Sequence, residues 1–247
     1  MKKIALLAGT TILIAGNAAA EFEIKESRTA SQEVTLELAN TIRVGDVNSG
    51  EERTSHEVGV NYGAFEYWTT GFAIEIENEQ GSSFDVGGIE WSNNFQIVGT
   101  PEDSEVESAF AMSIYSAFEF SLDGSKNIEF TVGPTFEYEA GATTFNANTL
   151  FYVPTGDADE NVGLKYALGT MYSLNDAMAL GIEAHGDFES IFEGSSEISD
   201  QEHFAGPAMN YEFELDNSEV EAKLGAFYGL TEASPTVGIA ANLEFGF

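Results

Sequence analysis

The sequence from Thr236 to Phe247 reads TVGIAANLEFGF and decides the fold class. Its apolar residues share one parity, while Gly, Ala, Asn and Glu hold the other; the apolar set is Val237, Ile239, Ala241, Leu243, Phe245 and Phe247. A period of two along the whole stretch predicts a β-strand with one apolar face. Strands of globular proteins usually have about five or six residues, whereas a tilted strand needs about 9–11 residues to cross a bilayer. The stretch therefore predicts a strand long enough to span a membrane.

The preceding segment, Glu219–Leu230, alternates in the same way, with Leu224 and Tyr228 on its apolar face. Together with the final aromatic residue, Phe247, this hairpin resembles the C-terminal end of Gram-negative outer-membrane β-barrels, where the barrel-assembly machinery recognises the last aromatic residue. The stretch Leu224–Pro235, with its motif GLTEASP, is also similar to the last hairpin of outer-membrane transporters and porins of unassigned substrate. These resemblances imply a barrel in outer-membrane lipid that serves passive transport.

The first twenty residues have the features of a secretory signal peptide. Lys2 and Lys3 precede an apolar stretch, Ile4–Ala15, and small residues lead up to Ala20. The small residues predict cleavage after Ala20. The apolar stretch is shorter than the roughly 20 residues of a membrane-spanning helix, which argues against an uncleaved membrane anchor. Residues 21–32 are polar and lack periodicity, which predicts a periplasmic N-terminal lead, too short to plug a barrel. The chain has no cysteine, which excludes disulfides and a lipidated cysteine.

The alternating pattern recurs ten more times between residue 33 and the final hairpin. The expected strands are 33–44, 56–66, 72–79, 84–98, 108–120, 127–139, 143–153, 161–173, 177–188 and 204–215. With the hairpin they number about twelve, and single-chain bacterial barrels use an even number; ten and fourteen stay as alternatives. Residues 33–247 are therefore predicted to form an all-β, transmembrane, antiparallel up-and-down β-barrel.

Two places in this pattern predict local irregularity. The apolar parity switches at Gly87-Gly88, which predicts a β-bulge within one long strand. Pro134 falls in the middle of its predicted strand. Since proline lacks the N–H that a ladder bond needs, the sheet is expected to be distorted there.

The two faces of the predicted strands differ in chemistry. The outward face is rich in Val, Ile, Leu, Phe, Tyr and Met, as lipid requires, whereas a soluble β-sandwich would place polar residues outward on shorter strands. The predicted inward acids are Glu37, Glu57, Glu75, Glu77, Asp85, Glu119, Glu129, Glu137, Glu139, Glu183, Asp187, Glu212, Glu214, Glu221 and Glu244. The predicted inward bases are Arg43, Lys165 and Lys223.

This charge pattern narrows the functions that the chain can have. The formal net charge is −33, and it becomes −35 when Lys2 and Lys3 leave with the signal peptide, which excludes binding to nucleic-acid phosphates. An acidic lumen predicts a porin-like channel for small cations or neutral solutes. The alternative is a structural or surface-binding barrel that acts through two predicted external loops, Gly45–Ser55 and Glu189–Glu202. Twelve strands fit either an open or a filled lumen.

Catalysis and cofactor binding have weaker support in the sequence. His185 and Asp187 lie two residues apart on one predicted inward face, and some outer-membrane proteases use Asp and His. A nucleophile within reach of a base is required for such chemistry, and no such set follows from the pattern, so no enzyme and no cofactor are predicted. Glu183, His185 and Asp187 could bind a divalent metal, but a solvated inward histidine is the preferred interpretation.

Overall fold

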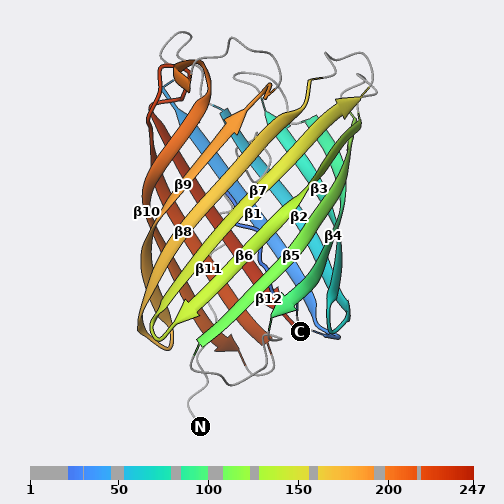
Figure 1. Ribbon diagram of the computed structural model, residues 1–247, viewed down its shortest axis with the longest axis vertical. Coiled ribbons are helices and arrows are strands. Elements are labelled where there is room, and N and C mark those ends of the chain that lie inside the picture. The colour runs from blue at the N-terminus through green and yellow to red at the C-terminus, as the bar shows by residue number, and fades with distance from the viewer. Residues whose placement is uncertain are drawn as a thin grey trace, which may run out of the picture.

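The structure is a computed structural model that describes residues 22–29, 31–45, 53–78, 85–99, 108–122, 128–155, 161–191, 198–215 and 218–247. Twelve strands form one closed antiparallel barrel in which each strand pairs with its neighbours in sequence, and β1 pairs with β12 (Figure 1). Their bounds are β1 Val34–Val44, β2 Arg53–Phe65, β3 Trp68–Asn78, β4 Asp85–Gly99, β5 Ser108–Ser121, β6 Ile128–Ala140, β7 Thr143–Thr155, β8 Gly163–Asn175, β9 Met178–Phe188, β10 Glu202–Leu215, β11 Ser218–Gly229 and β12 Val237–Gly246. The predicted fold class and the count of twelve are confirmed.

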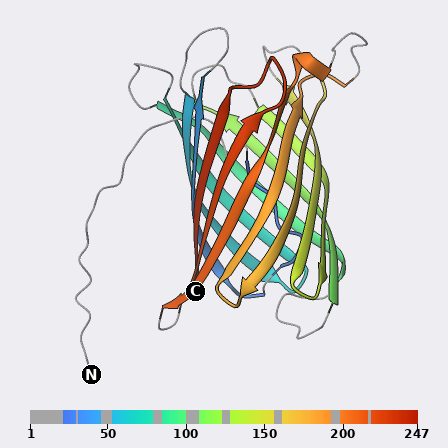
Figure 2. The same cartoon turned by 90° about the vertical axis from the view of Figure 1, so that its left-hand side faces the viewer.

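The two ends of the barrel differ in the length of their connections. At one end, here called the turn end, β1 begins, β12 finishes, and strands are joined by the two-residue connections 66–67, 141–142, 176–177 and 216–217 and the longer connection 100–107. The opposite end, here called the loop end, carries every connection that follows an odd-numbered strand, including 189–201 with the short 3-10 helix Ile198–Asp200 (Figure 2). Short turns on one side and long loops on the other are typical of outer-membrane barrels.

One strand begins earlier than the sequence suggested. The sequence predicted a strand over residues 72–79, but β3 starts at Trp68, and Trp68 pairs with Phe65 of β2 and with Phe95 of β4. The ring of Trp68 stacks on both phenylalanines at centroid distances of 5.7 and 5.8 Å. This aromatic packing holds the strand in the sheet although the two residues after Trp68, Thr69 and Thr70, lack an apolar pattern.

Both predicted irregularities are confirmed. The register between β3 and β4 shifts where Glu75 faces Gly88 and Ile76 faces Val86, so Gly87 is the extra residue of a bulge. At Pro134 the ladder between β6 and β7 passes from Val132 to Thr135 without pairs for Gly133 and Pro134. The same interruption recurs at Gly206-Pro207, where the ladder between β10 and β11 is broken.

The outer face carries the large apolar side chains. Ile182 is 62% exposed, and Phe72, Trp91 and Phe118 from three neighbouring strands stack in a row along the surface. Apolar side chains of this kind are suited to contact with lipid. The closed barrel also pairs the backbone groups of each strand with its neighbours, as lipid surroundings require. Within the described residues, no helix is long and apolar enough to cross a membrane.

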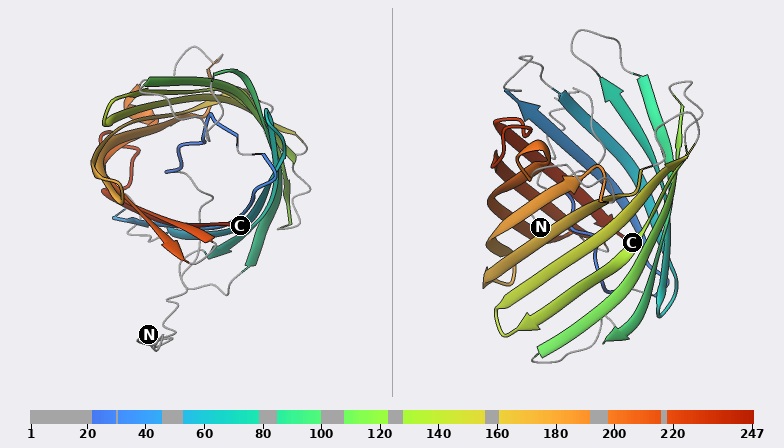
Figure 3. Two further views of the ribbon diagram at one scale, coloured as in Figure 1. Left: turned by 90° about the horizontal axis from the view of Figure 1, so that it is seen from below. Right: turned by 45° about the horizontal axis from the view of Figure 1, so that its top comes forward.

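The N-terminal segment 22–29, here called the lead, lies inside the barrel (Figure 3). The sequence predicted a periplasmic lead over residues 21–32, whereas the structure places residues 22–29 in the lumen. They run from the turn end, where the Gln32 N–H donates to the Gly63 carbonyl, toward Phe22, which packs among side chains of β9, β10 and β11. The physical reason is space: inward glycines leave room for the lead, since a Cβ on Gly238 would lie 2.5 Å from the Phe22 ring and one on Gly169 would lie 2.5 Å from Ile24 Cδ1.

Candidate functional site

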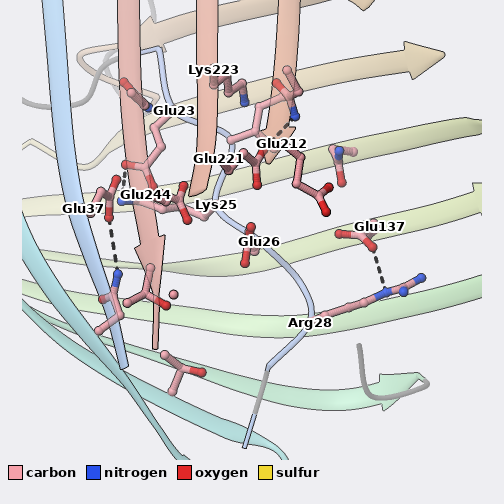
Figure 4. Close-up of a pocket in the computed structure, with 18 of the residues that line it drawn as sticks. Glu23, Lys25, Glu26, Arg28, Glu37, Glu137, Glu212, Glu221, Lys223 and Glu244 are labelled. Carbon is pink, nitrogen blue, oxygen red and sulfur yellow. Dashed lines mark hydrogen bonds and ion pairs between the residues drawn. The ribbon is translucent and has the colours of Figure 1, made fainter. Parts of the chain in front are cut away.

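A cavity of about 730 Å³ occupies the lumen between the lead and the barrel wall (Figure 4). Its lining extends from the turn end, where Glu33 and Asp176 lie, to the middle of the barrel, where Lys223 and Asn242 lie. Most of its charged lining residues are glutamates, from the lead and from the wall. At the mouth of the cavity, burial and then the neighbouring Glu219 carboxylate raise the pKa of Glu33 above its ordinary value.

Four glutamates form a continuous row across four adjacent strands. In the register of the sheet Glu212 of β10 faces Glu221 of β11, Glu221 faces Glu244 of β12, and Glu244 faces Glu37 of β1. All four line the cavity. Side chains directly opposite in a sheet have Cβ atoms about 4.5–5.5 Å apart, and like charges placed so are destabilising. A row of this kind concentrates negative potential on one side of the lumen and favours cations there.

A second acidic row lies nearer the loop end. Glu90 of β4 faces Glu119 of β5, which faces Glu129 of β6. Here the wall supplies a counter-charge, because the ammonium of Lys165 lies 3.4 Å from the Glu129 carboxylate. Tyr115 adds a hydroxyl that donates to Glu90 at 2.8 Å.

The other described arginine and lysine side chains of the wall also pair with wall acids. The Arg43 guanidinium meets Glu202 at 2.9 Å near the loop end. The Lys223 ammonium meets Glu183 at 3.1 Å, and the same carboxylate lies 3.1 Å from His185 Nε2. The wall therefore balances part of its own charge in the middle and the loop-end half of the barrel.

The lead supplies the counter-charge in the turn-end half. Arg28 is buried between two acids of β6, with Nε 2.8 Å from Glu137 and Nη2 3.1 Å from Glu139. Lys25 contacts Glu23 of the lead itself, and its ammonium lies 5.3 Å from the centroid of the Tyr115 ring. Both cations come from the segment that the sequence placed outside the barrel.

Hydrogen bonds with three strands, β4, β5 and β7, and with the turn between β2 and β3 hold the lead in place. Asn148 of β7 donates to the Lys25 carbonyl at 3.1 Å, Asn94 of β4 donates to the Glu26 carbonyl at 2.9 Å, and Ser113 of β5 donates to the Ser27 carbonyl. The Thr29 N–H donates to Gln96 at 3.2 Å, and the Thr29 hydroxyl donates to the Glu66 carbonyl at 2.7 Å. A segment without secondary structure is thus satisfied by wall side chains, as buried backbone groups must be.

An aromatic cluster surrounds the far end of the lead. Phe22 is 3% exposed; its ring stacks on Phe227 at 4.7 Å and meets Phe204 edge-on at 4.9 Å and His185 at 5.4 Å. Phe227 and Phe204 are inward residues in the loop-end half of their strands, and Ala240 of β12 completes the cluster. The cluster, here called the aromatic constriction, fills part of the lumen on the loop-end side of the acidic cavity.

The structure places the predicted lumen residues in three groups. The cavity gathers Glu37, Glu57, Glu137, Glu139, Glu212, Glu221, Glu244 and Lys223. The second group lies outside the cavity lining but on the inward parity of its strands. It contains Glu75, which faces Glu57 in the sheet, and, toward the loop end or the middle, Arg43, Glu119, Glu129, Lys165, Glu183 and Asp187. Glu214 is exposed on β10 near the turn end, and the side chains of Glu77 and Asp85 lie outside the described residues.

The cavity also contains residues that the sequence did not single out. These are Glu23, Lys25, Glu26, Arg28, Glu33, Glu90 and Glu219. Glu90 could have been found from the parity change at Gly87-Gly88, which puts it on the face opposite Ile89 and Trp91. The four residues of the lead belong to no periodic pattern, so their charge was the only signal in the sequence that could have pointed to them.

The candidate metal group on β9 does not converge. Glu183 pairs with His185 and Lys223, as described above, whereas the Asp187 carboxylate accepts a hydrogen bond from the Tyr152 hydroxyl at 2.8 Å. Lys165 lies over the same Tyr152 ring, 4.7 Å from its centroid. The three residues therefore serve two separate polar groups of the wall.

Comparison with known proteins places this fold among outer-membrane channels. No protein-family model and no curated protein matches the sequence. Among solved structures, the outer-membrane channel of the COG4313 group from Pseudomonas putida F1 is similar with a TM-score of 0.59 at 11% identity, covering 93% of this chain and 98% of the other. The NanC porin matches with a TM-score of 0.55 at 9% identity over 86% of this chain and 98% of its own. The KdgM porin, solved in complex with disordered oligogalacturonate, matches with a TM-score of 0.52 at 10% identity over the same shares. The chain thus has the fold of outer-membrane porins.

Proposed function

We propose that this protein is an outer-membrane channel for the passive passage of small cations or neutral solutes. The observation that carries the proposal is the row of four facing glutamates, Glu212, Glu221, Glu244 and Glu37, along one side of the cavity. Acidic rings favour cations in pores. The effect is strong where a narrow, low-dielectric wall confines the field.

The negative charge of the lumen disfavours anionic solutes. The similar KdgM porin was solved with oligogalacturonate, a chain of sugar carboxylates. A polyanion that entered this lumen would meet the glutamate row and would gain like-charge repulsion. Neutral solutes and cations avoid that cost, which supports the proposed solute class.

The test is the reversal potential of the purified protein in a planar bilayer across a salt gradient. Wild type should prefer cations, and the preference should fade at high salt, because the Debye length falls from about 30 Å at 0.01 M to about 3 Å at 1 M. Changing Glu212, Glu221 and Glu244 to Gln should lower the preference. The matched control, Glu189→Gln, removes one exposed carboxylate just beyond β9 and should leave it unchanged. Anion preference in wild type, or full cation preference in the triple variant, would refute the proposal.

The second candidate is a barrel that does not conduct and acts through its loop end. The packing of Phe22 against Phe227 and Phe204 favours it, because this cluster narrows the lumen above the cavity. The relevant loops are Gly45–Ser55 and Glu189–Glu202, parts of which lie outside the described residues. The bilayer measurement separates the two candidates, since a closed barrel gives no conductance steps.

The proposal includes export through a cleaved signal peptide and assembly of the barrel through its last residue. Cleavage after Ala20 would leave one residue before Phe22, which suits a lead that ends within the barrel. Phe247 exchanges backbone hydrogen bonds with Val34 and is exposed on the outside, where the barrel-assembly machinery and then lipid could contact it. Deleting Phe247 should lower the amount of folded barrel in the outer-membrane fraction; an unchanged amount would remove its assembly role.

A further inference from the structure

Three carboxylates from three separate parts of the chain meet beside the lead. Glu23 belongs to the lead, Glu37 to β1 and Glu57 to β2, and one oxygen atom from each lies within 4.8 Å of the others. Glu37 is 6% exposed and Glu57 is 8% exposed. Buried carboxylates of this kind are costly unless a cation or hydrogen-bond donors compensate them.

One oxygen atom of this group lacks such compensation. Glu37 Oε2 accepts a hydrogen bond from Asn61 Nδ2 at 3.3 Å. The other oxygen, Oε1, is buried and accepts no hydrogen bond from any residue that the structure describes. Buried polar atoms are almost always satisfied, so an unsatisfied carboxylate oxygen inside an acidic group indicates a missing cationic partner.

The charge balance indicates the valence of that partner. Lys25 contacts Glu23 and supplies one positive charge against the three carboxylates. The group therefore keeps two negative charges when all of its members are ionised. One divalent cation would neutralise it.

We propose that Glu23, Glu37 and Glu57 form a binding site for a hard divalent cation of the calcium type, which ties the lead to the barrel wall. Calcium accepts six to eight oxygen ligands in flexible geometries, whereas magnesium requires a near-ideal octahedron. Carboxylates drawn from a strand pair and an irregular segment suit the flexible case. Calcium binding at this site does not require ion passage through the barrel, so it can be tested independently of the channel function.

Equilibrium dialysis of the folded, detergent-solubilised protein against ⁴⁵Ca²⁺ in 1 M NaCl tests this site. At this ionic strength the Debye length is about 3 Å, so diffuse attraction to the acidic lumen is suppressed and coordination remains. Wild type should bind one calcium ion saturably. Glu37→Gln and Glu57→Gln should each weaken binding by at least about tenfold, since even outer-shell changes at metal sites cost that much. Glu189→Gln should bind as wild type.

Two further variants keep the test decisive. Glu23→Gln changes the lead and leaves every wall residue in place, so its loss of binding cannot come from a barrel that fails to fold; heat-modifiable gel migration checks folding of each variant. Lys25→Met removes the competing ammonium and should bind calcium at least as tightly as wild type. Absence of saturable binding in wild type, binding by Lys25→Met alone, or unchanged binding in Glu23→Gln and Glu37→Gln would overturn the proposal.

Discussion

The acidic side chains in the two halves of the lumen pair with cations from different parts of the chain. In the loop-end half and the middle, wall bases meet wall acids, as in the pairs of Arg43 with Glu202 and Lys165 with Glu129. In the turn-end half, the described counter-charges come largely from the lead, where Arg28 bridges Glu137 and Glu139. The counter-charges of the turn-end half therefore come largely from a segment that is not part of the sheet.

The halves also differ in what fills them. The loop-end half holds the ring of Phe22 packed against Phe204 and Phe227, while the turn-end half keeps the cavity of about 730 Å³. Buried aromatic pairs give large apolar contact, so the lead is anchored by packing at one end and by charge at the other. A change to the lead should therefore affect both the size and the charge of the path.

Deletion of residues 22–29, with the signal peptide and Glu21 left intact, should have the largest effect. The deleted charges Glu23, Lys25, Glu26 and Arg28 sum to zero, so a change in conductance would reflect the removal of volume and of the aromatic constriction. We expect single-channel conductance in planar bilayers to increase severalfold. Heat-modifiable gel migration controls for folding. Unchanged conductance in a folded barrel would mean that the lead does not limit the path.

This comparison also marks how far the sequence could predict the structure. The strands, the bulge at Gly87 and the break at Pro134 were predictable, because alternation, glycine and proline act on the local backbone. The position of the lead was not, because it depends on contacts distant in sequence, such as the Ser113 hydroxyl on the Ser27 carbonyl. No local pattern encodes such a contact.

The same limit applies to the candidate site. Inward parity was enough to select Glu37, Glu221 and Glu244, which do line the cavity. It did not reveal that these acids face one another in register, because register depends on strand pairing across the whole barrel. It also could not assign partners: Arg43 pairs with Glu202, 159 residues away.

Arg28→Gln should have a smaller effect, confined to charge. The change releases Glu137 and Glu139 into the cavity without removing the aromatic anchor. We expect cation preference, measured as the reversal potential at low salt, to increase. Arg43→Gln is the matched control, because it removes the same charge near the loop end beside Glu202. Equal shifts from both variants would show that the two halves are not electrostatically distinct.

The smallest predicted effect concerns the space that glycine leaves for the lead. A Cβ on Gly238 would lie 2.5 Å from the Phe22 ring, closer than real Cβ contacts allow, and that ring is already held between Phe227 and Phe204. In Gly238→Ala the lead should therefore shift more readily than the strand, whose backbone is held by ladder bonds to both neighbours.

Because the chain has no cysteine, an Ile24→Cys substitution gives a single reactive thiol on the lead. Its labelling by an impermeant thiol reagent in detergent should become moderately faster when Gly238→Ala is added. Gly59→Ala is the matched control: its Cβ would meet Ala73 and Glu37 at an ordinary 3.6 Å, so labelling should stay at the background rate. Equal acceleration by both changes would indicate general loosening of the barrel. No acceleration by Gly238→Ala would show that the Phe22 contact does not hold the lead, and the constriction would then rest on the hydrogen bonds from Asn148, Asn94 and Ser113.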